Sequence, residues 1–118
     1  MKLDYSDRPD GKLHIELRGE MDAPACSGLR SELEQILDTG NQAVVAMDLA
    51  NVSFIDSSGI GVIVYLYKSL KANDRTLEII NVQGQPRELF ELLRIGTAIP
   101  VRPAPEPTPS SENNPCAV

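Results

Sequence analysis

Apolar residues at alternate positions mark the first predicted strand. Every second residue from 13 to 17 is Leu or Ile and the residues between them are polar, a period of two that is typical of a strand with one buried face. Residues 8–11 are turn-forming, so residues 2–7 are predicted to pair with this strand as a hairpin. His14 falls on the polar side of the strand, and we interpret it as a surface residue.

A repeat of three to four residues predicts the first helix. Asp22 is a residue type that favours the N-cap, and Pro24 follows in the first turn, where its missing N–H costs nothing. Gly40 ends the pattern. Because Cys26 belongs to the apolar stripe, we interpret it as a small core residue and not as a reactive thiol. The stripe consists of Cys26, Leu29, Leu33, Ile36 and Leu37.

Strand-like and helix-like segments alternate along the rest of the chain. Residues 43–49 form a nearly continuous apolar run, which is typical of a buried central strand, and an apolar stripe of helical period follows over residues 60–70. Residues 76–81 are strand-like, and residues 98–101 are predicted to form a short final strand. Between them a last helix is predicted over residues 86–96, opened by proline and ended by glycine. The side chains of that helix expected to face the core are Leu89, Phe90 and Leu93.

The order of these elements predicts an α/β fold. We expect a single domain over residues 1–102, with a mixed, mostly parallel sheet of four to five strands and helices packed on it. The initial hairpin would supply an antiparallel edge. Residues 103–118 are rich in proline and poor in apolar side chains, so we expect a disordered tail there.

Composition argues against several classes of function. The 118 residues carry a formal net charge of −6, so the chain lacks the excess of Lys and Arg with which proteins contact nucleic acid, and a protein partner with a basic surface is expected instead. We find no apolar run of membrane-spanning length and no signal-peptide pattern, so we expect a cytoplasmic protein without membrane contact. Two widely separated cysteines and one histidine match neither a disulfide framework nor a metal site, and no cofactor is predicted.

Polar residues cluster where the second helix is predicted to begin. Asp56, Ser57 and Ser58 have side-chain oxygens of the kind that accept the unpaired N–H groups of a first helical turn. Gly59 and Gly61 permit a close approach of the backbone at the same place. From the residues alone, plain capping of a helix explains this segment, and a functional role of the serines remains an alternative.

Two catalytic interpretations of this segment fail on spacing. A nucleophile elbow requires Gly two residues before and two residues after its serine, and neither Ser57 nor Ser58 has a glycine two residues before it. A dinucleotide-binding motif beginning at Gly59 requires Gly or Ala at position 64, which is Val64. We therefore predict that the chain is not an enzyme.

Residues 52–62 resemble the signature of the STAS domain in bacterial anti-sigma factor antagonists. They read Val-Ser-Phe-Ile-Asp-Ser-Ser-Gly-Ile-Gly-Val. Residues 17–22 are similar to the G-E-hydrophobic-D turn of that family, and residues 86–92 are similar to its late helix. The resemblance covers residues 3–102 in order, which is nearly the whole predicted domain, and it implies a STAS fold.

The resemblance also implies a role for each matching residue. The phosphoacceptor would be Ser57, with Ser58 as the second choice. The family's partner is an anti-sigma factor that is also a serine kinase: the unphosphorylated antagonist binds it and releases the sigma factor, phosphorylation ends the interaction, and a serine phosphatase restores it. The residues implied in partner binding are Asp22, Asp56, Ser57, Ser58, Gly59 and Ile60.

STAS domains occur in more than one setting, so the resemblance leaves a second function open. The chain could be a non-switching accessory subunit of a transport ATPase or of a stress-signalling complex. In that case Ser57 would only contribute to the helix cap, and no cycle of phosphorylation would exist. An intact Asp-Ser-Ser acceptor in a stand-alone domain favours the switch.

Overall fold

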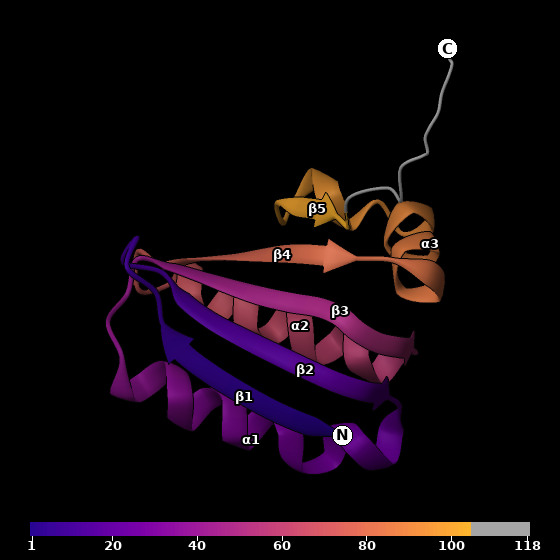
Figure 1. The fold of residues 1–118 in the computed structure, drawn as a ribbon, viewed down its shortest axis with the longest axis horizontal. Helices are drawn as coiled ribbons and strands as arrows, with labels where there is room; N and C mark the ends of the chain where they lie inside the picture. Colours follow the sequence, from indigo (N-terminus) through magenta and orange to yellow (C-terminus); the bar gives the residue numbers. More distant parts are fainter. Residues whose placement is uncertain (105–118) are drawn as a thin grey trace.

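Five strands form one mixed sheet in residues 1–104, the part of the chain that the computed structural model describes (Figure 1). The strands lie in the order in which they occur along the chain, and β1 is antiparallel to β2 while the other neighbours are parallel. The predicted fold class is thus confirmed. The strands are β1 (Lys2–Asp7), β2 (Leu13–Met21), β3 (Val44–Ile55), β4 (Thr76–Val82) and β5 (Val101–Pro103).

Two long helices, α1 (Ala23–Thr39) and α2 (Ser57–Lys71), contact each other and cover the same face of this sheet (Figure 1). Their apolar stripes meet the alternate apolar residues of the strands, as the sequence periods predict. A shorter helix, α3 (Gly84–Leu92), packs beside the end of β3 and is followed by the 3-10 turn Ile95–Thr97. Completely buried members of the core include Ile15, Leu17, Leu33, Met47, Leu49 and Ile63. None of the helices in residues 1–104 is long and apolar enough to cross a membrane.

The two central strands are longer than predicted, and this determines where the functional segment lies. β3 continues through Ile55 without a break, and β2 continues through the predicted turn to Met21. Gly19, with a φ of +115°, and two shifts in the β2–β3 register allow β2 to continue there. The two strands therefore end side by side, with Met21 paired to Ile55.

His14 is less exposed than the sequence predicts. Its side chain is on the sheet face that lacks helices, as expected, but only 17% of it is exposed. Its Nε2 lies 3.4 Å from Oδ2 of Asp48, and Nζ of Lys12 lies 3.1 Å from Oε1 of Glu78 on the same face. The carboxylate of Asp48, from the adjacent strand β3, lies against the ring, which a pattern along a single strand does not show.

The last helix differs from the prediction at both ends. It begins at Gly84, two residues before Pro86, and ends at Leu92. Phe90 is buried as predicted, whereas Leu93 is 49% exposed instead of facing the core. The chain leaves the helix because Arg94 adopts a left-handed backbone (φ 55°), and this turns Leu93 outward.

The final strand also lies later than predicted. β5 spans Val101–Pro103, not residues 98–101, and pairs with β4. The backbone N–H of Ala104 then donates to the carbonyl oxygen of Val82 at 3.0 Å, so hydrogen-bonded structure continues past residue 102. The rest of the predicted tail, residues 105–118, lies outside the described residues.

Candidate functional site

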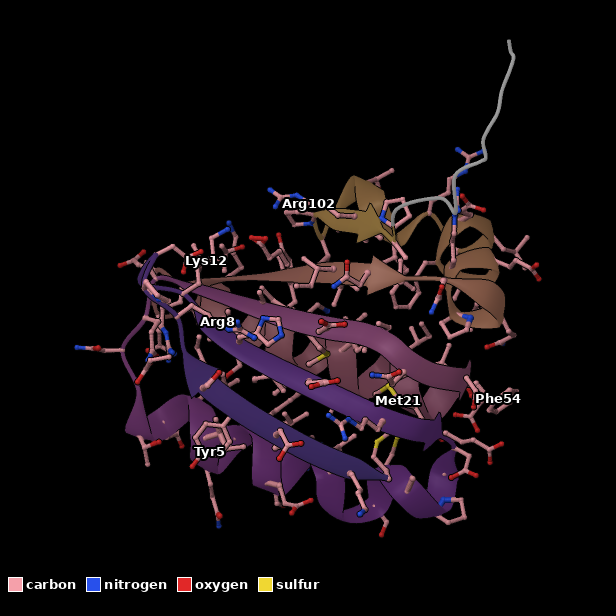
Figure 2. All side chains as sticks on the ribbon, viewed as in Figure 1. Tyr5, Arg8, Lys12, Met21, Phe54 and Arg102 are labelled. Atoms are coloured by element: carbon pink, nitrogen blue, oxygen red, sulfur yellow. The ribbon has the colours of Figure 1, made fainter. Side chains whose placement is uncertain are left out.

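The site begins where β2 and β3 end together. The backbone N–H of Asp56 donates to the carbonyl oxygen of Met21 at 3.2 Å, so the first residue after β3 is bonded to the last residue of β2. Met21 and Phe54 lie toward this same end of the sheet (Figure 2). Since Asp22 directly follows Met21, the fold brings two aspartates that are distant in sequence to neighbouring positions.

Asp56 is the N-cap of α2, as the sequence predicts. Its backbone is extended, and its Oδ1 accepts the N–H groups of Ser58 at 2.8 Å and of Gly59 at 3.3 Å. Its carbonyl oxygen accepts the N–H of Ile60 at 3.1 Å. One residue therefore satisfies three of the amides at the start of the helix, and Ser57 becomes the first helical residue.

The two serines face different surroundings. Ser57 is exposed, whereas Ser58 is partly buried and faces a groove of about 310 Å³ between α1 and α2. Gly59 is buried and Ile60 is partly buried. The groove is lined by Ala23, Cys26, Ser27, Arg30, Ser31, Ser58 and Val62.

Gly59 allows α2 to begin directly on the strand ends. A Cβ atom at this position would lie 2.5 Å from Cγ1 of Ile55 and 2.9 Å from Cβ of Met21. Both distances are shorter than carbon atoms tolerate, so any larger residue would push the helix away from the sheet. The glycine thus sets the height of the serines above the strands.

Asp22 forms a second N-cap next to the first. Its Oδ1 accepts the N–H of Ala25 at 3.0 Å, which confirms the predicted cap of α1. Cys26 is buried, as predicted, and burial raises the pKa of its thiol; the carboxylates of Asp56 and Asp22 raise the same pKa further. Because Asp22 directly follows Met21, to which Asp56 is hydrogen-bonded, the structure brings Asp22 next to the start of α2.

Gln85, which no sequence pattern singled out, supports this segment from the side of α3. The backbone N–H of Ile55 donates to Oε1 of Gln85 at 2.9 Å, and Nε2 of Gln85 donates back to the carbonyl oxygen of Ile55 at 2.9 Å. A glutamine near the start of a short helix has no periodicity or motif that would single it out. Only the spatial contact reveals it.

The groups around Ser57 define the chemistry available to its hydroxyl. Ser57 is exposed, and Oδ1 of the neighbouring Asp56 accepts two backbone amides of the first helical turn. The only histidine of the chain contacts Asp48 on the helix-free face of the sheet. Within residues 1–104, no group of His, Cys, Asp and Glu side chains is placed to hold a metal ion.

A family model agrees with this architecture. The model of the STAS domain matches residues 6–106, which include all three helices and most of the sheet. The chain belongs to the STAS domain family. This confirms the resemblance seen in residues 52–62.

The chain is also similar to named anti-sigma factor antagonists of other bacteria. An anti-sigma-B factor antagonist of Staphylococcus epidermidis is 32% identical over 83 residues, which is 70% of this chain and 76% of that protein. An anti-sigma-B factor antagonist of Listeria monocytogenes is 26% identical over 102 residues, which is 86% of this chain and 89% of that protein. The chain is therefore similar to anti-sigma factor antagonists over most of their length.

Solved structures of the Bacillus anti-sigma factor antagonist SpoIIAA share the fold. The unphosphorylated form superposes with a TM-score of 0.70 at 21% identity, over 85% of this chain and 87% of that one. The phosphorylated form superposes with a TM-score of 0.65 at 21% identity, over 85% of this chain and 90% of that one. At this level of identity the likeness shows the fold alone.

Proposed function

We propose that this STAS protein is an anti-sigma factor antagonist, and that phosphorylation of Ser57 switches off its binding to an anti-sigma factor with serine-kinase activity. The observation that carries the proposal is the exposed hydroxyl of Ser57 at a helix start of defined geometry. The names of the relatives support the class of function, and SpoIIAA has been solved in unphosphorylated and phosphorylated forms. The proposal includes a serine phosphatase, a cytoplasmic location and no catalytic activity of the chain itself.

Ser57 is favoured over Ser58 as the acceptor because a kinase must reach the hydroxyl. Ser57 is exposed, whereas Ser58 faces the groove between α1 and α2 and its N–H is bonded to Asp56. A kinase could approach Ser57 without moving either helix. To reach Ser58, a kinase would have to enter the groove between α1 and α2.

The proposed partner-binding surface lies at the same end of the sheet as Ser57. Its acidic members, Asp22 and Asp56, fit a partner with a basic surface, because opposite potentials favour and orient association. Both carboxylates are partly buried at helix starts, so they hold fixed positions relative to Ser57. The accessible members of the proposed surface are Asp22, Asp56, Ser57, Ser58 and Ile60, and the buried Gly59 supports them by packing on Ile55 and Met21.

Phosphate at Ser57 should change the surface more than the fold. A phosphoserine has a charge of about −1.5 to −2 at neutral pH. The helix dipole favours an anion at this position by about 0.3–1 kcal/mol, and the like charge of the adjacent Asp56 opposes it. These local effects largely cancel, whereas burying the charged group against a partner shaped for a hydroxyl is costly. A cost of about 2.7 kcal/mol would weaken binding a hundredfold.

Mass spectrometry and binding measurements test the proposal. Protein isolated from its native host should contain a phosphate on Ser57. Ser57→Ala should bind the kinase constitutively, and Ser57→Asp should bind about a hundredfold more weakly while its circular dichroism and urea unfolding stay close to those of the wild type. Ser58→Ala is the matched control and should still accept phosphate. An unfolded Ser57→Asp variant would refute the surface account.

The accessory-subunit alternative predicts different results in the same experiments. The chain would carry no phosphate on Ser57 in its native host. Ser57→Ala and Ser57→Asp would bind its complex equally well, because the serine would serve only as part of the helix start. Such a pair of results would replace the switch with the accessory role.

A further inference from the structure

The C-terminal part of β3, after Asp48, has a neighbouring strand on one side only. β4 pairs with β3 from Val44 to Asp48, whereas β2 pairs with β3 as far as Ile55. The edge of β3 that faces α3 therefore runs without a strand partner directly into Asp56. Backbone groups on such an edge need other partners when they are buried, and Ile55 is completely buried.

Two glutamines from the start of α3 replace the absent strand. Gln83 donates from Nε2 to the carbonyl oxygen of Ala50 at 2.8 Å. Gln85 both accepts from the N–H and donates to the carbonyl oxygen of Ile55, at 2.9 Å each, and so reproduces the pair of bonds that a neighbouring strand would make. A single primary amide can do this because it has a donor and an acceptor side by side.

Gln85 completes a set of restraints around the proposed acceptor. On one side, the N–H of Asp56 is bonded to Met21 of β2. On the other side, Gln85 holds the preceding residue, Ile55. Ser57 directly follows these two restrained residues, so the orientation of its side chain depends on the hydrogen bonds of Ile55 and of Asp56. Gln83 has no such relation to Ser57, since its partner is six residues before Asp56.

We propose that Gln85 is a positioning residue, which rests on the proposed function of Ser57: its two hydrogen bonds to Ile55 hold the end of β3 so that the Ser57 hydroxyl is presented to the kinase in one orientation. Helix α3 thereby becomes part of the acceptor site, although it contributes no group that receives phosphate. An equilibrium among several orientations would reduce the fraction of molecules ready for transfer.

Hydrogen exchange of the purified protein tests the positioning directly and needs no kinase. Gln85→Met keeps the length of the side chain and removes the amide. We expect the amide hydrogens of Ile55 and Asp56 to exchange about tenfold faster in Gln85→Met, because each tenfold step corresponds to about 1.4 kcal/mol, the usual range for a buried hydrogen bond. Gln83→Met is the matched control and should leave both amides as slow as in the wild type.

A second variant distinguishes positioning from a general contribution to stability. In Gln85→Glu at neutral pH, the introduced carboxylate can still accept the Ile55 N–H but cannot donate to the carbonyl oxygen. When the carboxyl group is protonated it regains a donor, so protection of the Ile55 amide should return toward the wild-type value as the pH falls through the range of a carboxyl pKa. Gln83→Glu corrects for the effect of pH on exchange itself.

Phosphorylation kinetics then connect the restraint to Ser57. With the anti-sigma factor kinase and ATP, Gln85→Met should lower kcat/KM for Ser57 about tenfold, while Gln83→Met should not change it. Uniformly faster exchange over all core amides, unchanged exchange at Ile55, or equal kinetics for the two variants would each overturn the inference. Absence of phosphate on the wild-type protein would instead refute the proposed function, and exchange at Ile55 would still decide whether Gln85 holds the end of β3.

Discussion

Helices α1 and α2 begin in the same way and at the same end of the sheet, yet only one of them carries a proposed acceptor. Each follows a central parallel strand, and each is capped by an aspartate with an extended backbone, Asp22 for α1 and Asp56 for α2. The first turn of α1 is Ala-Pro-Ala, which contains no hydroxyl. The first turn of α2 is Ser-Ser-Gly, and its first serine is exposed.

The difference shows that a capped helix start is not in itself a functional signal. Both caps satisfy backbone amides by the same chemistry. The start of α2 is distinguished by three further features: an exposed hydroxyl, a glycine pressed onto Ile55 and Met21, and restraint of the preceding residue by Gln85. Capping satisfies backbone amides at both helices, and these further features occur only at the proposed acceptor.

The largest expected effect comes from moving the hydroxyl between the two helices. Ser57→Ala should abolish phosphate incorporation by the anti-sigma factor kinase. Adding Ala23→Ser, which places a serine at the equivalent first position of α1, should not restore it, because Ala23 lacks the restraints around Ser57. Incorporation is measured with labelled ATP and mass spectrometry. Phosphate on the transplanted serine would mean that any capped helix start is sufficient.

Replacing Gly59 of α2 or Gly28 of α1 by alanine should change the free energy of unfolding in opposite directions. Gly59→Ala should lower the free energy of unfolding by about 1–3 kcal/mol, because the new methyl group would overlap Ile55 and Met21. A Cβ atom at Gly28 in α1 would meet no atom within 4 Å, so Gly28→Ala should raise the free energy of unfolding by about 0.5–1 kcal/mol. Gly61→Ala is the control within α2, since it also meets nothing. Urea unfolding measures all three, and equal values for Gly59→Ala and Gly61→Ala would contradict the tight contact.

Removal of each cap should cost about 0.5–2 kcal/mol of stability. The loss of stability in Asp56→Ala should be toward the upper end of this range, because the Asp56 carboxylate accepts two backbone amides whereas that of Asp22 accepts one. Asn at either position keeps the acceptor oxygen and should restore most of the loss in urea unfolding.

One of these asparagine variants, Asp22→Asn, also tests the partner surface. Asp22→Asn retains the cap but removes the charge, so it should weaken binding to the kinase while stability stays nearly unchanged. Undiminished affinity of a folded Asp22→Asn protein would remove Asp22 from the proposed surface.

The smallest effect concerns the thiol between the two caps. In a Cys116→Ser background, the pH midpoint for alkylation of Cys26 should lie above that of a free cysteine, because burial and then the carboxylates of Asp56 and Asp22 raise the pKa of the thiol. Asp56→Asn should lower this midpoint more than Asp22→Asn does. An identical midpoint in all three proteins would show that neither carboxylate influences the thiol.

Much of the fold was predictable because periodicity along the chain reflects burial. The alternation over residues 13–17, the apolar run near residue 45 and the stripe of α2 each correspond to an observed element. Predictions were weaker near the end of the domain. There a left-handed residue, Arg94, ends α3 early, and the position of β5 depends on pairing with β4.

Local chemistry along the chain determined the candidate site in part. Asp22 and Asp56 were recognisable as caps, and the pair of serines was recognisable as a cluster at a helix start, because capping acts between residues two or three positions apart. Local chemistry alone did not separate Ser57 from Ser58, and only the resemblance to the family ranked Ser57 first. Their different exposure depends on α1, which lies beside Ser58 and leaves Ser57 open to solvent.

The sequence by itself determined the α/β class, the two capped helix starts and the membership in the STAS domain family, since all three follow from patterns along the chain. The tertiary structure decided the rest. It placed Asp22 beside Asp56 through the Met21–Ile55 pairing, pressed Gly59 onto both strands, and brought Gln85 from thirty residues away to the edge of β3. Hydrogen bonds and close packing between distant segments depend on the three-dimensional path of the chain, and no short pattern records that path.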